Sequence, residues 1–157
     1  MTRQQGLKIA GSFPAVRTSG LTIRNGNLDD IEAVLRFWAE AAEGTDRHDD
    51  PDKVVRLVER DPEALLVAEL EGRMVGTLIA GWDGWRAHLY RLAVDPGHRR
   101  MGIGSRLIEA AEARFRTFGA FRADAMVLHD NTLAHHAWSA SGYARQPQWG
   151  RWVKPLD

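Results

Sequence analysis

The sequence predicts a mixed α/β (α+β) fold in a single domain, with a mostly antiparallel sheet of six to seven strands flanked by about four helices. Short apolar segments separated by tight turns, at residues 71–73 and 83–84, are typical of antiparallel hairpins. A strand-like segment that ends at Val94 precedes an amphipathic segment and another strand, an order typical of a crossover connection. The chain has 157 residues, 44% of them hydrophobic and 27% charged, which suits one globular domain.

The first regular elements follow a segment without periodicity. Residues 1–20 carry neither a helical nor a strand pattern, so we expect an irregular N-terminal arm before a domain that spans residues 21–157. Residues 21–24 alternate as in a strand. Asn27 is a favoured N-cap residue with acidic neighbours in the first turn. It precedes apolar residues at helical spacing, which are Ile31, Val34, Leu35 and Trp38.

A polar break at residues 44–50 separates that helix from a second one, for which Pro51 suits the first turn. After residue 62 the pattern changes from helical to extended. We expect three consecutive strands here, at residues 64–70, 74–82 and 86–94.

The C-terminal third returns to a helical pattern. From Ile103 to Phe118 apolar residues fall on one face of a helix, and Glu112 and Arg116 are spaced to pair on the other. A strand at residues 123–128 and a helix at residues 131–141 follow. The tail, residues 143–156, contains Trp149, Trp152 and Val153, and we expect it to supply one or two final strands.

Composition excludes several classes of protein. Lys plus Arg and Asp plus Glu both number 21, a balance unlike the positive excess of a dedicated nucleic-acid binder. The chain has no cysteine, so it has no disulfide, no thiol nucleophile and no cysteine-ligated metal. No apolar run approaches the ~18 residues of a membrane helix, and the first twenty residues lack a signal-peptide pattern. We therefore expect a cytoplasmic protein without a membrane or nucleic-acid partner.

The segment most informative about chemistry joins the strand that ends at Val94 to the next helix. Gly102 and Gly104 lie where this helix begins, among the basic residues Arg99, Arg100 and Arg106. Free backbone N–H groups and the helix dipole form an anion site at such a position, so the segment suits either a diphosphate or simply a tight turn. A P-loop needs Gly-Lys-Ser/Thr after its glycines, and a dinucleotide fingerprint needs a third Gly at position 107, which is Leu.

Two motifs resemble those of the GNAT superfamily of acyl-CoA-dependent N-acetyltransferases. Residues 92–104 (LAVDPGHRRMGIG) resemble its acetyl-CoA-binding pattern Arg/Gln-x-x-Gly-x-Gly/Ala, and residues 127–143 resemble its second motif, in which an Asn opens a helix that ends in Gly-Tyr. The resemblance implies a GNAT-like fold over about the last 137 residues. It also implies transfer of an acetyl group from acetyl-CoA to a primary amine of a small molecule, peptide or protein, by direct attack in a ternary complex.

The resemblance assigns the cofactor contacts by position. It implies that main-chain groups of Leu92, Ala93 and Val94 bind the pantetheine arm. It implies that Asn131 forms a hydrogen bond near the same arm, although Asn is equally a favoured N-cap. The pyrophosphate is then held by the amides that lead into the helix, those of Arg99, Arg100, Met101, Gly102, Ile103, Gly104 and Ser105.

The sequence departs from the family at the positions that move protons. Family members resemble one another in placing a Glu five residues before the Asn and a Tyr seven residues after it; these residues are Met126 and Trp138 here. Trp138 would offer an indole N–H to the thiolate. The departure leaves open a second function, that of a non-catalytic acyl-CoA binder or sensor.

His88 is the candidate general base. It lies six residues before Val94, a position that resembles that of the base in histone acetyltransferases, and a neutral imidazole suits the task. Strand alternation predicts that His88, Tyr90, Leu92 and Val94 share one face. The alternative is a half-buried histidine packed near Tyr90.

Aromatic and charged residues near His88 are candidates for acceptor binding. Trp82, Trp85 and Tyr90 suit either an acceptor pocket or the closure of a hairpin. The acids of residues 47–50 suit either a cationic amine or a polar surface loop.

Neither a metal site nor a fixed oligomeric state is predicted. His135 and His136 diverge by about 100° on a helix, so we expect no metal at these residues or at His129. A homodimer is left open, because Trp149 and Trp152 suit an interface as well as a core.

Overall fold

The computed structural model describes residues 19–41 and 49–156. Within them the sheet has five strands in the order β1-β2-β3-β4-β5. They are β1 (Leu21–Asn25), β2 (Leu65–Leu70), β3 (Arg73–Trp82), β4 (Ala87–Val94) and β5 (Ala123–Ala125). The pairs from β1 to β4 are antiparallel and β4 pairs with β5 in parallel. The predicted hairpins and crossover are confirmed, and the predicted arm falls almost wholly outside the described residues.

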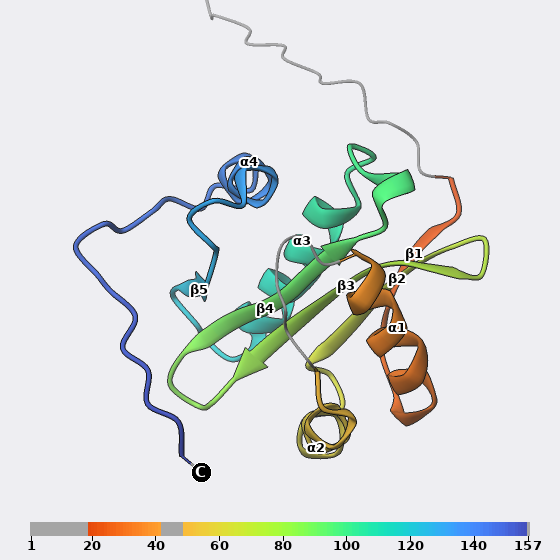
Figure 1. The fold of residues 1–157 in the computed structure, drawn as a ribbon, viewed down its shortest axis with the longest axis horizontal. Helices are drawn as coiled ribbons and strands as arrows, with labels where there is room; N and C mark the ends of the chain where they lie inside the picture. Colours follow the sequence, from red (N-terminus) through yellow and green to blue (C-terminus); the bar gives the residue numbers. More distant parts are fainter. Residues whose placement is uncertain (1–18, 42–48, 157) are drawn as a thin grey trace, which may run out of the picture.

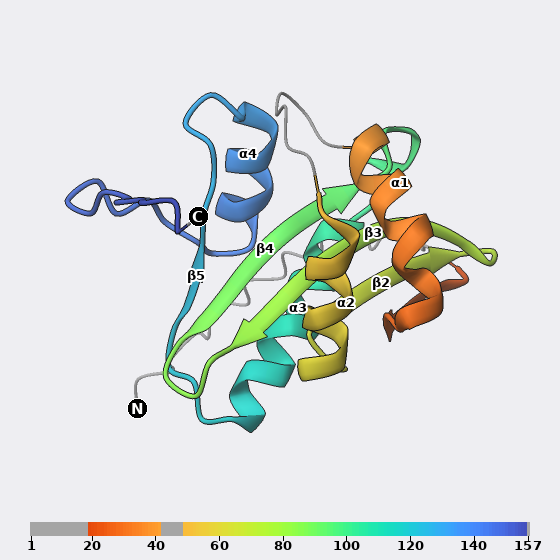
Figure 2. The ribbon, with the colours of Figure 1, turned by 60° about the horizontal axis from the view of Figure 1, so that its bottom comes forward.

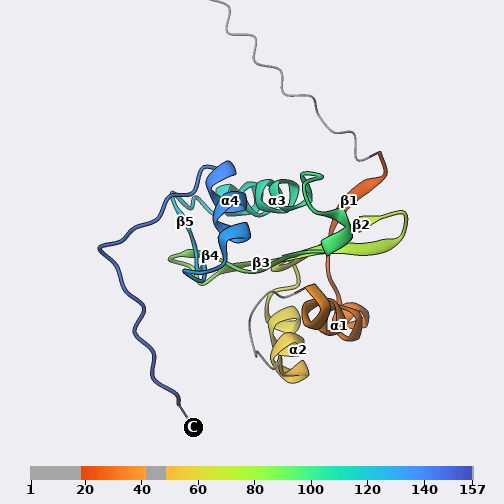
Figure 3. The same cartoon turned by 45° about the horizontal axis from the view of Figure 1, so that its top comes forward.

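Helices cover both faces of the sheet. The helices are α1 (Ile31–Ala41), α2 (Pro51–Arg60), α3 (Ile103–Thr117) and α4 (Thr132–Ala140). Figure 3 shows α1 and α2 on one side of the sheet and α3 and α4 on the other, and Figure 1 shows the tail leading away beyond β5. No described helix is both long and apolar enough to cross a bilayer.

The predicted cap at Asn27 and a second cap at Asp50 fix where the first two helical segments begin. Asn27 accepts a hydrogen bond from the Asp29 amide at 2.9 Å, and the Asp30 carboxylate accepts one from the Asn27 amide at 2.8 Å. The reciprocal pair satisfies amides that would otherwise lack partners at the start of the helical segment. Asp50 caps α2 in the same way, through the Asp52 amide at 2.9 Å, and Pro51 follows it.

Each face of the sheet buries its own apolar cluster. On the α3 side the buried residues include Leu78, Leu89, Ile103, Leu107 and Phe115. On the α1 and α2 side they include Val34, Val54, Val58, Leu65 and Val67. The two clusters identify the face to which each strand residue points.

A bulge in β4 interrupts the alternation that the sequence predicts. Tyr90 pairs with Ile79 and Ala93 with Thr77, so two residues of β4 lie opposite one residue of β3. Arg91 adopts a left-handed φ of 55°. Leu92 and Val94 consequently pack on the α3 side with Leu89, whereas His88 and Tyr90 alternate with Leu89 and face the α1 and α2 side. The prediction that His88, Tyr90, Leu92 and Val94 share one face is wrong, because a bulge moves every later side chain to the opposite face.

The prediction of six to seven strands is also wrong. The segment expected as a strand at residues 123–128 is extended only over Ala123–Ala125, and the tail forms no strand over its described residues. Pro147 and Pro155 lack the N–H that a ladder requires. Trp149 and Trp152 are 74% and 96% exposed, so no buried face holds a strand in register.

Gly76 in β3 allows α3 to lie close to the sheet. A Cβ at this position would come within 2.9 Å of Ile103 Cγ2 and 3.0 Å of Leu107 Cδ1. We predict that Gly76→Ala lowers the free energy of unfolding by about 1–3 kcal/mol, because overpacking a filled interface forces side chains and backbone to shift. Urea unfolding measures it, with Gly150→Ala as the control, since nothing lies within 4 Å of that added Cβ. An unchanged midpoint for Gly76→Ala would contradict the packing argument.

Candidate functional site

A cleft opens where β4 and β5 diverge. The two strands pair only over residues 87–89 and 123–125, and Figure 2 shows β4 continuing past the end of β5 toward α4. The cleft has a volume of about 520 Å³, within the range of small-molecule sites. Its walls are the end of β4, residues 98–105, residues 126–128, one side of α4, and Trp38 and Ala41 of α1.

One end of the cleft is the start of α3. Gly102 precedes the helix with a φ of 76°, and no side chain caps it. Within the described chain the amides of Ile103, Gly104 and Ser105 have no hydrogen-bond partner. Three free amides, the positive end of the helix dipole and the neighbouring arginines together form a site for an anion.

Gly104 has no packing reason to be glycine. Its φ is not left-handed, and an added Cβ would meet only Val94 Cγ2 at an ordinary 3.8 Å. Glycine in a helix is less stable than alanine by about 0.5–1 kcal/mol. Gly104 lines the cleft beside the free amides, and the lack of a side chain there leaves room that fits a diphosphate.

The long wall of the cleft is an unpaired strand edge. Beyond Leu89, no strand of the described chain pairs with β4 on the β5 side, and Leu92, Ala93 and Val94 line the cleft. Peptide groups on such an edge bind an extended amide-bearing chain as an added strand would. The fit to a pantetheine arm therefore rests on the main chain.

Helix α4 closes the far wall. Asn131 lines the cleft and caps the helix through Oδ1, which accepts from the Ala134 amide at 3.0 Å. Trp138 is buried in the wall, edge-on to Tyr143 with ring centroids 5.0 Å apart. Tyr143 donates a hydrogen bond to Glu112 at 3.1 Å. Burial raises the pKa of the Tyr143 phenol, as does the neighbouring carboxylate, so Tyr143 holds its proton and braces Trp138.

A polar network reaches the β4 bulge from α1. The Nε1 of Trp38 donates to Thr77 Oγ1 at 2.8 Å, and the Thr77 hydroxyl donates to the Arg91 carbonyl at 3.2 Å. The Arg91 guanidinium lies 5.3 Å from the Trp38 ring centroid and forms an ion pair with Asp49. Sequence reasoning missed Thr77 and Arg91, because no local pattern marks a bulge or its buried partner.

The predicted acceptor residues lie outside the cleft. His88 is partly buried on the outer face of β4, with Nε2 3.7 Å from Asp83 Oδ2 and its ring 5.9 Å from Tyr90. Amides of Arg86 and Trp85 donate to Asp83 and lower the pKa of its carboxyl, so it stays charged beside His88. Burial raises the pKa of Tyr90, which excludes the phenolate at neutral pH.

The two tryptophans close a hairpin instead of lining a pocket. Trp82 stacks on Phe118 at 5.4 Å, on the α3 side. Trp85 is 80% exposed at the turn. Of the acidic loop, Arg47 and His48 lie outside the described residues, Asp49 pairs with Arg91 and Asp50 caps α2.

The histidines near α4 have partners other than a metal. His135 Nε2 lies 2.8 Å from the Leu128 carbonyl, and His129 Nδ1 lies 3.2 Å from an Arg145 nitrogen. Across residues 19–41 and 49–156, no three His, Cys, Asp or Glu side chains cluster as metal ligands do.

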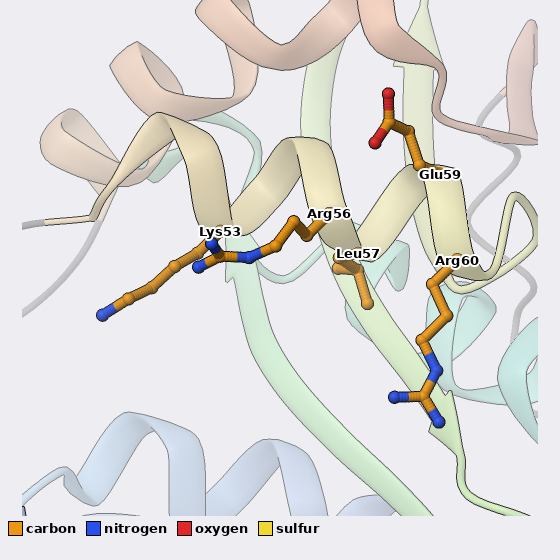
Figure 4. A pocket seen from close by; sticks show the side chains of 5 residues that line it. All are labelled: Lys53, Arg56, Leu57, Glu59 and Arg60. Atoms are coloured by element: carbon orange, nitrogen blue, oxygen red, sulfur yellow. The ribbon is translucent and has the colours of Figure 1, made fainter. Parts of the chain in front are cut away.

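A second, shallow depression lies on the outer side of α2. Lys53, Arg56, Leu57, Glu59 and Arg60 line it. Figure 4 shows Lys53 and Arg56 extending to one side and Arg60 to another. The side chains do not converge on a common point, so this surface is a solvated helix face.

Comparisons with known proteins identify the family of this chain. Residues 31–143 match the model of the acetyltransferase (GNAT) family. An acetyltransferase from Pectobacterium atrosepticum is 36% identical over 112 residues, which cover 71% of this chain and 79% of the relative.

Solved structures share the fold. Ard1 from Thermoplasma volcanium superposes with a TM-score of 0.71 and 26% identity, over 80% of this chain and 83% of the other. The PaiA N-acetyltransferase from Thermoplasma acidophilum, in complex with coenzyme A, superposes with a TM-score of 0.69 and 17% identity, over 76% and 87% of the two chains. The chain belongs to the acetyltransferase (GNAT) family and is an acyl-CoA-dependent N-acetyltransferase.

Proposed function

We propose that this enzyme transfers an acetyl group from acetyl-CoA to a primary amine by direct attack in a ternary complex. The observation that carries the proposal is the cleft between β4 and β5, which leads from an unpaired strand edge to three free amides at the start of α3. Acetyl-CoA supplies the activated acetyl thioester.

Binding is divided between main chain and helix dipole. The amides of Ile103, Gly104 and Ser105 bind the pyrophosphate, with Arg99, Arg100, Met101 and Gly102 shaping the turn before them. The edge of β4 from Leu92 to Val94 binds the pantetheine arm, and Asn131 faces it across the cleft.

The acceptor amine must lose a proton before it attacks. At pH 7 deprotonation costs about 4.6 kcal/mol for a lysine-type amine and about 1.4 kcal/mol for an α-amine. A weak base therefore suffices for an α-amine or another amine of low pKa. We propose that the acceptor is such an amine, on a small molecule or a peptide.

His88 is the proposed base, and it acts through water. Four residue steps along β4 lead from His88 to Leu92, which is about 13 Å in a regular strand and too long for direct contact. Asp83 orients the imidazole from 3.7 Å, and Tyr90 stands beside it on the same face.

The leaving group needs less help than the nucleophile. A thiol has a reference pKa of about 8.5, so the thiolate departs near neutral pH without a strong acid. Trp138 takes the position of the family's tyrosine, and its indole N–H stabilises the departing sulfur.

Gly104→Ala tests the diphosphate cradle. We expect CoA affinity, measured by calorimetry, to fall at least tenfold, because the new methyl group projects toward the phosphates. Thermal stability should stay the same or rise, since alanine is the better helix former. Gly150→Ala should leave both unchanged. Wild-type affinity for CoA in Gly104→Ala would place the diphosphate elsewhere.

His88→Ala tests the base. We expect amine-dependent thiol release to fall about a hundredfold, in the range of general-base contributions, while CoA binding stays intact. His129→Ala, an exposed histidine outside the cleft, serves as the control. Full activity in His88→Ala, with an α-amine acceptor in excess, would remove His88 from this role.

A further inference from the structure

We propose that Thr77 is a positioning residue for acetyl-CoA, because it holds the bulge that turns the end of β4 toward the cleft. The inference deepens the proposed function and rests on it. Thr77 does not itself line the cleft, and it acts through Arg91 and Trp38, which do.

The bulge requires a buried partner for its carbonyl. Thr77 is fully buried, and it is the only buried polar residue in the described chain. Its hydroxyl accepts from Trp38 and donates to the Arg91 carbonyl, so one side chain satisfies a buried indole N–H and a partly buried carbonyl. Leaving either group without a partner is costly in a dry interior.

The side chain of Arg91 is fixed from the other side. A left-handed φ at a non-glycine residue is unfavourable and persists only where its surroundings determine it. The Trp38 ring and Asp49 hold the guanidinium, while Thr77 holds the carbonyl. Trp38 takes part in both contacts and therefore couples α1 to the bulge.

The bulge decides what β4 presents to the cleft. With it, Leu92 and Val94 pack on the α3 side, and Ala93 lies on the α1 side. Without it, regular alternation would reverse these three residues and turn their peptide groups. The peptide groups proposed to bind pantetheine therefore depend on Thr77.

Three substitutions separate positioning from simple packing. Thr77→Val keeps the shape of the side chain and removes both hydrogen bonds, and Thr77→Ser keeps the hydroxyl. Trp38→Phe keeps an aromatic ring beside Arg91 and removes the N–H together with part of the ring volume. Val58→Ala is the stability control, because Val58 is a buried residue of α2 and does not line the cleft.

The readouts are CoA affinity by calorimetry, the KM for acetyl-CoA against kcat, the melting temperature, and backbone amide NMR shifts of residues 91–94 in the free protein. We expect Thr77→Val to weaken CoA binding and raise this KM about tenfold, which is about 1.4 kcal/mol, and to move the shifts of residues 91–94. Trp38→Phe should do the same to a smaller extent. Thr77→Ser should resemble the wild type, and Val58→Ala should lower the melting temperature without changing CoA affinity.

Thr77→Val with unchanged CoA affinity and unchanged shifts at residues 91–94 would overturn the inference while leaving the proposed function intact. Failure of the wild-type protein to bind CoA would overturn the proposed function itself. If Thr77→Val does not fold, Trp38→Phe decides, and wild-type CoA affinity in that variant would overturn the coupling through α1.

Discussion

The divergence of β4 from β5 is the constraint on which the rest of this molecule depends. β4 pairs with β3 along most of its length, but only three of its residues pair with β5. Had the two strands stayed paired, the main chain of β4 would be satisfied within the sheet and no cleft would exist. The bulge at Arg91 lies just beyond Leu89, the last β4 residue that pairs with β5. The side chains of β4 therefore change face close to the point where its pairing with β5 ends. The start of α3 then lies at the end of an edge that is already open.

In a chain with no net charge, an anionic ligand can be attracted only by groups close to its site. Net charge gives this protein no long-range attraction for polyphosphates. The dipole of α3 and its first amides act only over the first turn, and Arg99 and Arg100, which line the cleft, add charge at the same place. Such a site would be selective through geometry, because only a group that reaches the first turn of α3 meets the amides of Ile103, Gly104 and Ser105.

The sequence predicted what depends on local patterns and missed what depends on distant contacts. Turn residues, caps and helical spacing located four helices and the hairpins, and the two glycines marked the start of α3. The tail was predicted wrongly. Its aromatic residues favour a strand, but Pro147 and Pro155 lack the N–H groups that a strand needs for pairing. The shared face of His88, Tyr90, Leu92 and Val94 was predicted wrongly, because one inserted residue reverses the alternation after Tyr90. Thr77 from the neighbouring strand and Trp38 from a helix stabilise that residue. Neither partner is near Arg91 in sequence.

Thioester binding and proton transfer differ in the same way, because the first depends on the backbone and the second on individual side chains. In the proposed function, thioester binding rests on peptide groups and does not depend on the side chains of Met126 and Trp138. Proton transfer rests on side chains, and Met126 and Trp138, which lie where the resemblance implies a glutamate and a tyrosine, do not titrate. The thiolate leaves readily, so the remaining barrier is the proton of the amine. His88 lies beside Asp83 on the outer face of β4. Under the proposed mechanism, deprotonation of the amine therefore depends as much on the pKa of the acceptor as on the enzyme. Under the proposed mechanism, selectivity for weakly basic amines would arise because no strong base lies beside the thioester.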